Sequence, residues 1–219
     1  MSLVDQVVSA LTPPESDEAR QEATQKARGR ATPGDWLSQI LDHHDLIREQ
    51  FVAAKRATTV EEALAAQKRL AKVLVAHSIA EEVAIYPVIA AIGDTGHATM
   101  AYTEQSAAKM QMGLLERLEP LSEDYVDKLG HIEGAVLHHV YEEEGTWFID
   151  IKQQASDEDQ ARAAHKYREI FERNMGTGDG ASSSYMGGSA AGGVTTGSAA
   201  GGSANDVASA GTLSGHHEL

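Results

Sequence analysis

Residues 70–88 have the sequence LAKVLVAHSIAEEVAIYPV, in which apolar side chains recur at helical spacing. His77 and Glu81 lie four residues apart on the apolar stripe, so one helix directs both side chains to the same spot. The apolar residues that flank this pair are Leu70, Val73, Leu74, Ala84, Ile85 and Val88. Because a histidine and an acid interrupt a core stripe, the pattern indicates a polar site inside the protein.

The pattern His-x-x-x-Glu-Glu occurs a second time at residues 139–144, which read HVYEEE. The apolar residues on the same stripe as His139 and Glu143 are Ile132, Ala135, Val136 and Trp147. The alternative pair, His138 and Glu142, shares its stripe with His131, Gly134 and Gly145, which form a poorer core. We therefore place His139 and Glu143 on the inner face of this helix.

A third histidine interrupts the stripe of an earlier helix, which begins near Asp35. The apolar residues of that stripe are Leu37, Ile40, Leu41, Ile47 and Phe51. His44 lies on it, whereas turning His43 inward brings Gln39 and Gln50 to the same face. His44 is therefore the histidine expected to point inward.

The sequence predicts an all-α protein, because helix-forming residues are abundant and only five prolines are present. Thr59 and Glu62 form a capping-box pattern that opens a second helix, which runs to Gly93 with a kink near Pro87. A third helix is expected over 95–119, a fourth over 122–153 and a fifth over 156–176. Since the connections between the four central helices are short, the prediction is an up-down-up-down antiparallel four-helix bundle.

Four regions follow from this pattern. Residues 1–33 form an N-terminal helical arm, residues 34–153 the bundle, and residues 154–176 an additional C-terminal helix. In residues 177–219, 31 of 43 positions are Gly, Ser, Ala or Thr. Such a segment buries too little apolar surface to fold, so a disordered, flexible tail is expected there, with no partner indicated.

Composition excludes several classes of function. The formal net charge is −15, which argues against binding to nucleic acid or to an anionic membrane surface. The chain has no cysteine, which excludes disulfides, thiolate metal sites and cysteine nucleophiles and fits a reducing compartment. The longest apolar run, residues 83–92, is too short to cross a bilayer. We therefore expect a cytoplasmic protein with no membrane contact.

Helix lengths place the selected histidines and acids in one layer of the bundle, matched to within about one turn, ~5–8 Å. Unpaired charges in such a layer are costly. Either the carboxylates take up protons, or they share hydrogen bonds, or a cation lies between them. Nitrogen and carboxylate donors without sulfur suit iron, manganese or zinc, and two bridging carboxylates in a bundle favour a two-metal centre.

Residues 35–150 resemble the hemerythrin-like family, the HHE cation-binding domains. The matching motifs are His44-Asp-Leu-Ile-Arg48 with Phe51, His77-x-x-x-Glu81-Glu82 with Ile85-Tyr86-Pro87, and His139-x-x-x-Glu143-Glu144. The resemblance implies a left-handed four-helix bundle with a non-haem di-iron centre. It also implies that His44 and His77 bind one iron, that His139 binds the other, and that Glu81 and Glu143 bridge them.

The chain departs from the family pattern in the third helix. The family usually has a histidine after an acid there, whereas this chain has Gln105 after Glu104. A neutral amide is a weaker iron ligand than imidazole. We therefore expect two irons per chain, of which the one beside His139 is under-ligated, bound by water or Glu104 instead, or lost. His97 lies too near the helix start to replace the missing ligand.

The first functional hypothesis is binding or sensing of oxygen, or of a related diatomic such as nitric oxide, in an apolar pocket beside the iron. The pocket candidates are Leu41, Ile47, Leu74 and Ile85. The alternatives are a peroxide-consuming, catalase-like enzyme, which the open position at Gln105 favours, and an iron-reservoir or sensor domain. Tyr86, Tyr102, Tyr141 and Trp147 are expected to serve in packing, the alternative being that a phenol near an oxidising centre donates an electron or a hydrogen bond. Glu144 is expected to be an ordinary helix carboxylate. His43 and His138 are expected beside the site or on the surface, and His165 on the surface.

Overall fold

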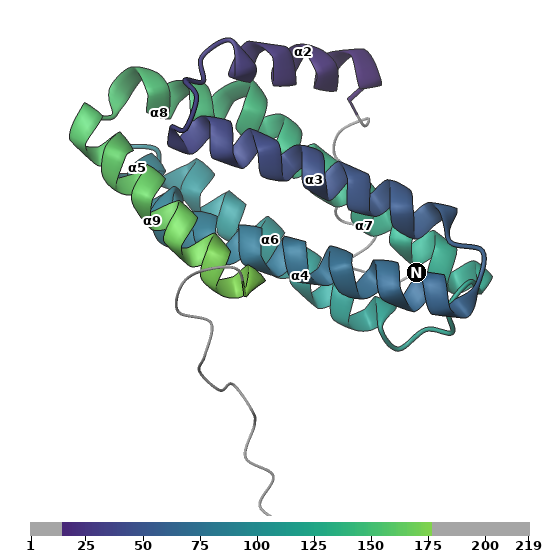
Figure 1. Ribbon diagram of the computed structural model, residues 1–219. Helices are drawn as coiled ribbons and strands as arrows, with labels where there is room; N and C mark the ends of the chain where they lie inside the picture. The colour runs from purple at the N-terminus through teal and green to yellow at the C-terminus, as the bar shows by residue number, and fades with distance from the viewer. Residues whose placement is uncertain (1–14, 177–219) are drawn as a thin grey trace, which may run out of the picture. The chain divides into compact units, whose positions relative to one another are not determined.

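The computed structural model describes residues 15–176, which are helical and contain no strand (Figure 1). The α-helices are α2 (Asp17–Arg28), α3 (Trp36–Arg56), α4 (Val60–Ala84), α5 (Tyr86–Ala91), α6 (Thr95–Leu115), α7 (Glu123–Glu142), α8 (Phe148–Gln154) and α9 (Asp157–Met175). A π-helix, η1 (Glu143–Trp147), joins α7 to α8. The predicted tail and the first fourteen residues of the predicted arm lie outside the described residues.

The long helices begin where the sequence provides capping side chains. Asp35 accepts a hydrogen bond from the backbone N–H of Ser38 at the start of α3. Thr59 and Glu62 form the predicted capping box at the start of α4. Each cap satisfies backbone N–H groups that have no partner within the helix. These local signals fix where the helices that carry the site begin.

The four long helices α3, α4, α6 and α7 pack side by side. Helix α3 contacts α4 and α7, and α6 contacts the same two helices. Their apolar side chains form two separate core clusters, one containing Leu41 and Ile85 and the other containing Ile47 and Leu74. His44 lies between Leu41 and Ile47 on α3, so a polar layer separates two apolar layers. The arrangement is consistent with the predicted bundle.

Two of the predicted long helices are interrupted. The second ends at Ala84, and α5 begins at Tyr86, next to the expected kink at Pro87, whose ring nitrogen cannot donate a helical hydrogen bond. The fourth was predicted to continue to residue 153, but it changes to a π-helix over Glu143–Trp147. π-helical turns have no simple signal in the sequence and occur frequently at functional sites.

Two helices outside the four pack against them. Helix α2 contacts η1, α3 and α7, and α9 contacts α4 and α3. Ala23 and Ala27 of α2 are buried, as are Tyr167 and Phe171 of α9. Both helices therefore contribute buried surface next to the polar layer.

The segment Val60–Ala91 is long and apolar enough to pass a composition test for a membrane span. However, 61% of its most apolar window is buried inside the protein, as in a core helix. The apolar composition of α4 and α5 is therefore explained by packing against the neighbouring helices.

Candidate metal centre

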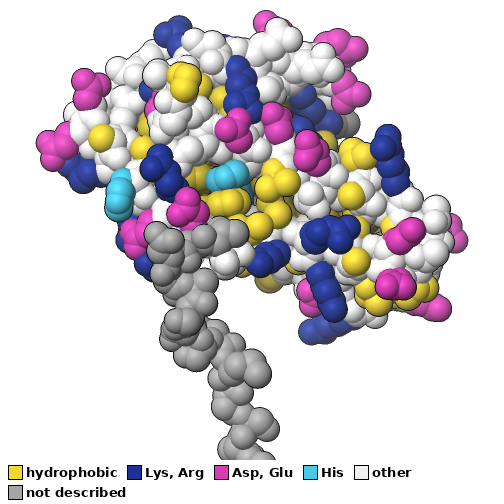
Figure 2. All heavy atoms as spheres, viewed as in Figure 1, with side chains coloured by type: hydrophobic (Ala, Val, Ile, Leu, Met, Phe, Trp, Pro, Cys, Tyr) yellow, Lys and Arg dark blue, Asp and Glu magenta, His cyan; other side chains and the backbone are white. Residues whose placement is uncertain are grey.

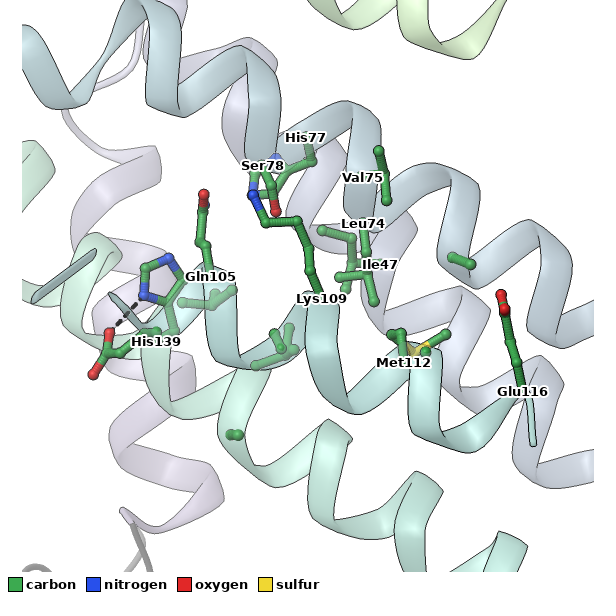
Figure 3. A pocket seen from close by; sticks show the side chains of 17 residues that line it. Ile47, Leu74, Val75, His77, Ser78, Gln105, Lys109, Met112, Glu116 and His139 are labelled. Atoms are coloured by element: carbon green, nitrogen blue, oxygen red, sulfur yellow. Dashed lines mark hydrogen bonds and ion pairs between the residues drawn. The ribbon is translucent and has the colours of Figure 1, made fainter. Parts of the chain in front are cut away.

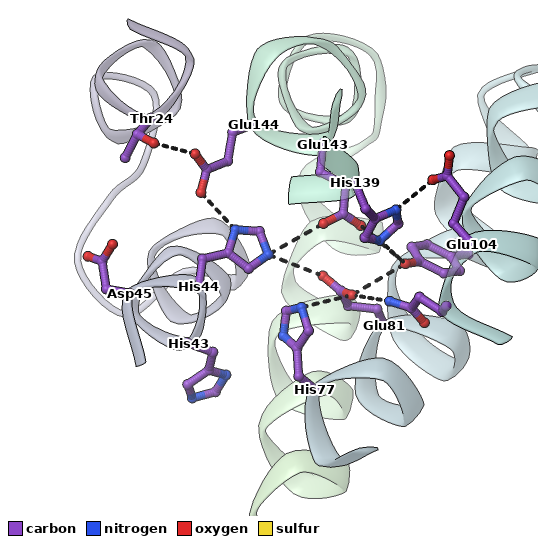
Figure 4. A network of polar contacts seen from close by, with 12 residues as sticks. Thr24, His43, His44, Asp45, His77, Glu81, Glu104, His139, Glu143 and Glu144 are labelled. Carbon is purple, nitrogen blue, oxygen red and sulfur yellow. Dashed lines mark hydrogen bonds and ion pairs between the residues drawn. The ribbon is translucent and has the colours of Figure 1, made fainter. Parts of the chain in front are cut away.

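The five histidines and acids selected from the sequence come together in the polar layer (Figure 4). Helix α3 supplies His44, α4 supplies His77 and Glu81, α7 supplies His139, and η1 supplies Glu143. Each of these residues is at most 6% exposed. Four of them each offer one potential ligand atom, and these four atoms lie within 4.8 Å of one another. The four residues are His44, His77, Glu81 and Glu143.

Both carboxylates lie between imidazoles. Glu143 has Oε1 3.2 Å from Nε2 of His139 and Oε2 3.4 Å from Nε2 of His44. Glu81 has Oε2 3.1 Å from Nε2 of His77 and Oε1 3.9 Å from Nε2 of His44. Each acid therefore directs its two oxygens toward different histidines, and Glu143 reaches from His44 to His139, as a carboxylate that bridges two cations needs to do.

Several atoms that face the centre make no hydrogen bond. They are Nε2 of His44, Nε2 of His77, Oε1 of Glu81 and Oε2 of Glu143. Buried polar atoms normally have partners, and leaving them unpaired costs free energy. A cation bound by these atoms would satisfy all of them together. The donor set of imidazole nitrogen and carboxylate oxygen therefore fits iron, manganese or zinc.

The other ring nitrogen of each inward histidine is held from outside. The contacts are His44 Nδ1 with Glu144 at 2.8 Å, His77 Nδ1 with the Tyr167 hydroxyl at 2.9 Å, and His139 Nδ1 with Glu104 at 2.8 Å. Such contacts fix the tautomer and orientation of the ring, leaving Nε2 free to bind a cation. All three imidazoles therefore present the same nitrogen to the centre.

Glu144 is not the ordinary helix carboxylate that the sequence suggested. It is 1% exposed and accepts hydrogen bonds from Arg48 of α3 and from the Thr24 hydroxyl of α2. The π-helical turn buries both Glu143 and Glu144, although they are adjacent in the chain. Thr24, Arg48 and Glu144 thus hold His44 from the side opposite the centre.

The two alternatives considered on the third helix have different positions. Glu104 lies against the outer nitrogen of His139, so it supports that ring and does not replace a ligand at the centre. Gln105 is 3% exposed, and its Nε2 donates to Oε2 of Glu81 at 2.6 Å, while its Oε1 makes no hydrogen bond. Gln105 therefore faces the centre.

Two tyrosines at the site were not among the residues selected from the sequence. Tyr86 was expected to pack, with a hydrogen bond at the centre as the alternative, and its buried hydroxyl contacts Glu81, His139 and Glu143. Tyr167 carried no signal, because its position depends on how α9 docks. The residues around Tyr167 show only the ordinary spacing of an amphipathic helix, which does not indicate a site.

Four further histidines among the described residues do not face the centre. His43 is half-buried, with Nδ1 2.8 Å from the Tyr167 hydroxyl and its ring stacked on Phe171. The ring of His97 stacks on Trp147, and His138 pairs with Glu15 at 2.8 Å. His165 is exposed, as predicted.

Burial and charge oppose each other at the inward histidines. Burial lowers the pKa of His44, but the carboxylates of Glu143 and Glu144 outweigh it and raise this pKa to about 9. Burial likewise lowers the pKa of His139, and Glu143 and Glu104 outweigh it and raise the pKa well above 6.5. Burial raises the pKa of Glu143, but His139 and His44 bring it far below its usual value. The buried acids thus attract positive charge, which protons supply when no metal is bound.

We expect the metal-free protein to lose stability as the pH rises from about 6.5 to about 9. Folding raises the pKa of His44 from 6.5 to about 9, so its stabilising effect is complete below 6.5 and is lost through 9. Burial lowers the pKa of His43 to about 3, so its effect on stability no longer changes above 6.5. Melting temperatures measured with excess chelator test this, and a constant value across the range contradicts it.

An apolar cavity adjoins the centre on the side of α4, α6 and α7 (Figure 3). Its volume is about 180 Å³, and His77, Gln105 and His139 form part of its wall. Of the pocket residues selected from the sequence, Ile47 and Leu74 line it. Leu41 and Ile85 do not, because they belong to the core cluster on the other side of the polar layer.

We expect Tyr167→Phe to weaken metal binding by roughly 10- to 100-fold, the usual loss when a partner of a metal-binding histidine is removed. The change removes the hydroxyl that holds Nδ1 of His77. Tyr125→Phe is the control, because Tyr125 is a buried tyrosine whose hydroxyl makes no hydrogen bond. Competition with a chelator measures both affinities, and equal values in the two variants would contradict the role of Tyr167.

Comparison with known proteins places the chain in a family. One relative is a protein named DNA nickase from Nostoc sp. (strain PCC 7120 / SAG 25.82 / UTEX 2576), which is 29% identical over 97 residues. The match covers 44% of this chain and 28% of that protein's length. No solved structure gave a significant match. Residues 37–150, just over half of the chain, match the hemerythrin HHE cation-binding domain, so the chain belongs to the hemerythrin HHE family.

Proposed function

We propose that this protein is a non-haem di-iron protein that binds or senses dioxygen, or a related diatomic ligand, in an up-down-up-down four-helix bundle. The observation that carries the proposal is the set of buried, inward-facing nitrogen and oxygen atoms that make no hydrogen bond. Family membership makes a bound metal, typically iron, the natural partner of these atoms.

In this proposal the residues divide between two iron positions. His44 and His77 would hold one iron through Nε2, and His139 would hold the other. Glu81 and Glu143 would bridge the two positions. Glu143 supports this assignment directly, because one of its oxygens lies toward His44 and the other toward His139. This assignment uses all five of the histidines and acids selected from the sequence.

The cavity beside the centre favours a small molecule as the ligand. Its walls include the apolar side chains of Ile47, Leu74, Met112, Val136 and Val140. Such apolar walls suit an uncharged diatomic molecule. Lys109 and Glu116 also line the cavity, and Lys109 pairs with Glu82 at 2.5 Å.

Iron, when bound, supplies the reversible affinity for the ligand, and the chain supplies the surroundings. Glu104, Glu144 and Tyr167 hold the three histidines in the orientation that binding needs. The amide of Gln105 lies beside Glu81 and offers hydrogen-bonding groups at the wall of the cavity.

A peroxide-consuming enzyme is the second candidate, and Gln105 is the observation that favours it. Because an amide binds iron more weakly than imidazole does, the position beside His139 is open to a second substrate molecule. The ferrous protein, prepared without oxygen, distinguishes the two functions. A charge-transfer band that forms with oxygen and disappears on its removal supports binding, whereas sustained gas evolution from added peroxide supports the enzyme.

We expect Gln105→His to raise iron binding at the position beside His139 by at least about 10-fold, because imidazole replaces a neutral amide there. The wild-type amide is buried and faces Glu81, so the new ring occupies the correct side of α6. Titration with ferrous iron, followed by counting iron per chain, measures the change. Gln111→His, on the same helix, is the control, and an equal effect in both variants counts against the assignment.

The activity in the name of the Nostoc relative is not proposed for this chain. The matched region is little more than a quarter of that protein. The net charge of −15 disfavours contact with DNA, whose phosphates bind clustered cations. On the face shown in Figure 2, acidic and basic side chains are interspersed. We therefore propose a diatomic molecule or peroxide as the ligand, and no nucleic acid or membrane partner.

A further inference from the structure

Tyr86 is the residue at the centre that the division into iron ligands leaves out. It begins α5, directly after the end of α4, and it is 0% exposed. Its ring packs edge-on against Tyr102, with 5.0 Å between the ring centroids. Packing alone would be served equally well by phenylalanine, so the hydroxyl needs its own explanation.

The Tyr86 hydroxyl contacts three of the proposed ligand atoms. It lies 3.1 Å from Oε1 of Glu143, 3.2 Å from Nε2 of His139 and 3.3 Å from Oε2 of Glu81. Nε2 of His139 and Oε1 of Glu143 are themselves 3.2 Å apart. The Tyr86 oxygen therefore contacts one atom each from α4, α7 and η1.

These spacings are those of donors around a single cation. Donors bound tetrahedrally at about 2.0–2.1 Å from a metal lie about 3.3–3.4 Å from one another. The three distances from the Tyr86 oxygen, and the distance between His139 and Glu143, fall between 3.1 and 3.3 Å. The tyrosine oxygen therefore lies where a further ligand of the His139-side metal belongs.

The His139 side also lacks an imidazole. In the proposed division, His139 is the single histidine assigned to this metal position. The third-helix position beside it carries Gln105, a neutral amide. A phenolate oxygen is a hard, anionic donor, and tyrosine is an established type of ligand for ferric iron. Tyr86 supplies the negative charge that the amide cannot.

We propose that the oxygen of Tyr86 is a ligand of the metal on the His139 side, in place of the missing third-helix imidazole. This inference rests on the proposed function, because it needs a metal at that position. When the oxygen–metal bond forms, the hydroxyl O–H bond breaks and its proton passes to bulk water. In the metal-free protein the hydroxyl keeps its proton and hydrogen-bonds to the neighbouring carboxylates.

The test compares wild-type protein with Tyr86→Phe. Both are loaded with ferrous iron without oxygen, freed of unbound metal, and oxidised with ferricyanide, which accepts one electron per iron. A phenolate bound to ferric iron gives a visible charge-transfer band with tyrosine ring vibrations in its resonance Raman spectrum. We expect this band in the wild type and its complete loss in Tyr86→Phe, together with a fall from two irons per chain toward one.

Two further variants keep the result interpretable. Tyr102→Phe removes the neighbouring hydroxyl, which donates to the backbone oxygen of Glu82, and should retain the band. Tyr86→His restores a donor without a phenolate, so it should retain the second iron and lack the band.

The outcomes separate the two proposals. Iron that binds to the wild type without a tyrosine band, or with a band that Tyr86→Phe retains, overturns the role of Tyr86 and leaves the proposed function intact. A wild-type protein that takes up no iron overturns both.

Discussion

Replacing His77 by alanine is expected to remove iron from the protein and to lower its stability at the same time. The Nε2 atom of His77 faces Glu81, and its Nδ1 atom contacts the hydroxyl of Tyr167. The substitution therefore deletes a proposed ligand, removes the partner of a buried acid, and removes one polar contact between α9 and α4. Loss of a buried partner and of the ring volume together should cost roughly 3 kcal/mol in the metal-free protein.

In the presence of iron the difference in stability should be larger. A metal that binds only the folded state stabilises it by an amount that grows with the ratio of its concentration to its dissociation constant. Calorimetry with and without ferrous iron separates the two contributions. His165→Ala is the matched control, since His165 is exposed on α9. Full iron content and an unchanged melting curve in His77→Ala would show that the site is wrongly assigned.

Replacing Glu143 by glutamine is expected to weaken metal binding more than His77→Ala does. The substitution also changes the size of the side chain less. Glutamine has nearly the same size, but it loses the charge and one of the two oxygens that face His44 and His139. Since Glu143 is proposed to bridge both metals, affinity at both positions should fall by more than about 100-fold, beyond the loss caused by an outer partner. Counting metal per chain after gel filtration measures this.

The neighbouring residue provides the comparison for Glu143. Glu142→Gln makes the same chemical change one residue earlier, at a side chain that is not among the buried polar groups. It should retain full metal content. If Glu143→Gln also retains two irons per chain, the carboxylate is not a bridge and the two-metal arrangement fails.

Much of the centre could be predicted from local spacing. In a helix, residues four apart share a face, so His77 with Glu81 and His139 with Glu143 were recognisable as pairs before any packing was known. The same periodicity selected His44 over His43, and the structure places His44 inward and His43 against Tyr167 and Phe171. Spacing along a helix is thus a reliable guide where the apolar stripe is clear.

The rest depends on packing between segments that are distant in the chain. Thr24 reaches Glu144 across 120 residues, and Tyr167 reaches His77 across 90. Tyr86 faces the centre because α4 ends before it and α5 begins a new helix there. The choice of pocket residues was half wrong, because Leu41 and Ile85 pack on the opposite side of the polar layer from the cavity.

These distant contacts also extend the centre beyond the family domain. The family match covers residues 37–150, whereas α2 and α9 lie outside it. Each of these helices supplies a hydroxyl, Thr24 or Tyr167, that acts on the outer side of an inward histidine. We therefore expect the flanking helices to influence metal affinity.

The central claim is that these buried acids and imidazoles are held together by multivalent cations. Elemental analysis of the full chain, loaded anaerobically with ferrous iron and freed of unbound metal, tests it most directly. The account predicts two iron atoms per chain, both lost in Glu143→Gln. A wild-type chain that retains no metal and is equally stable with and without iron would contradict it.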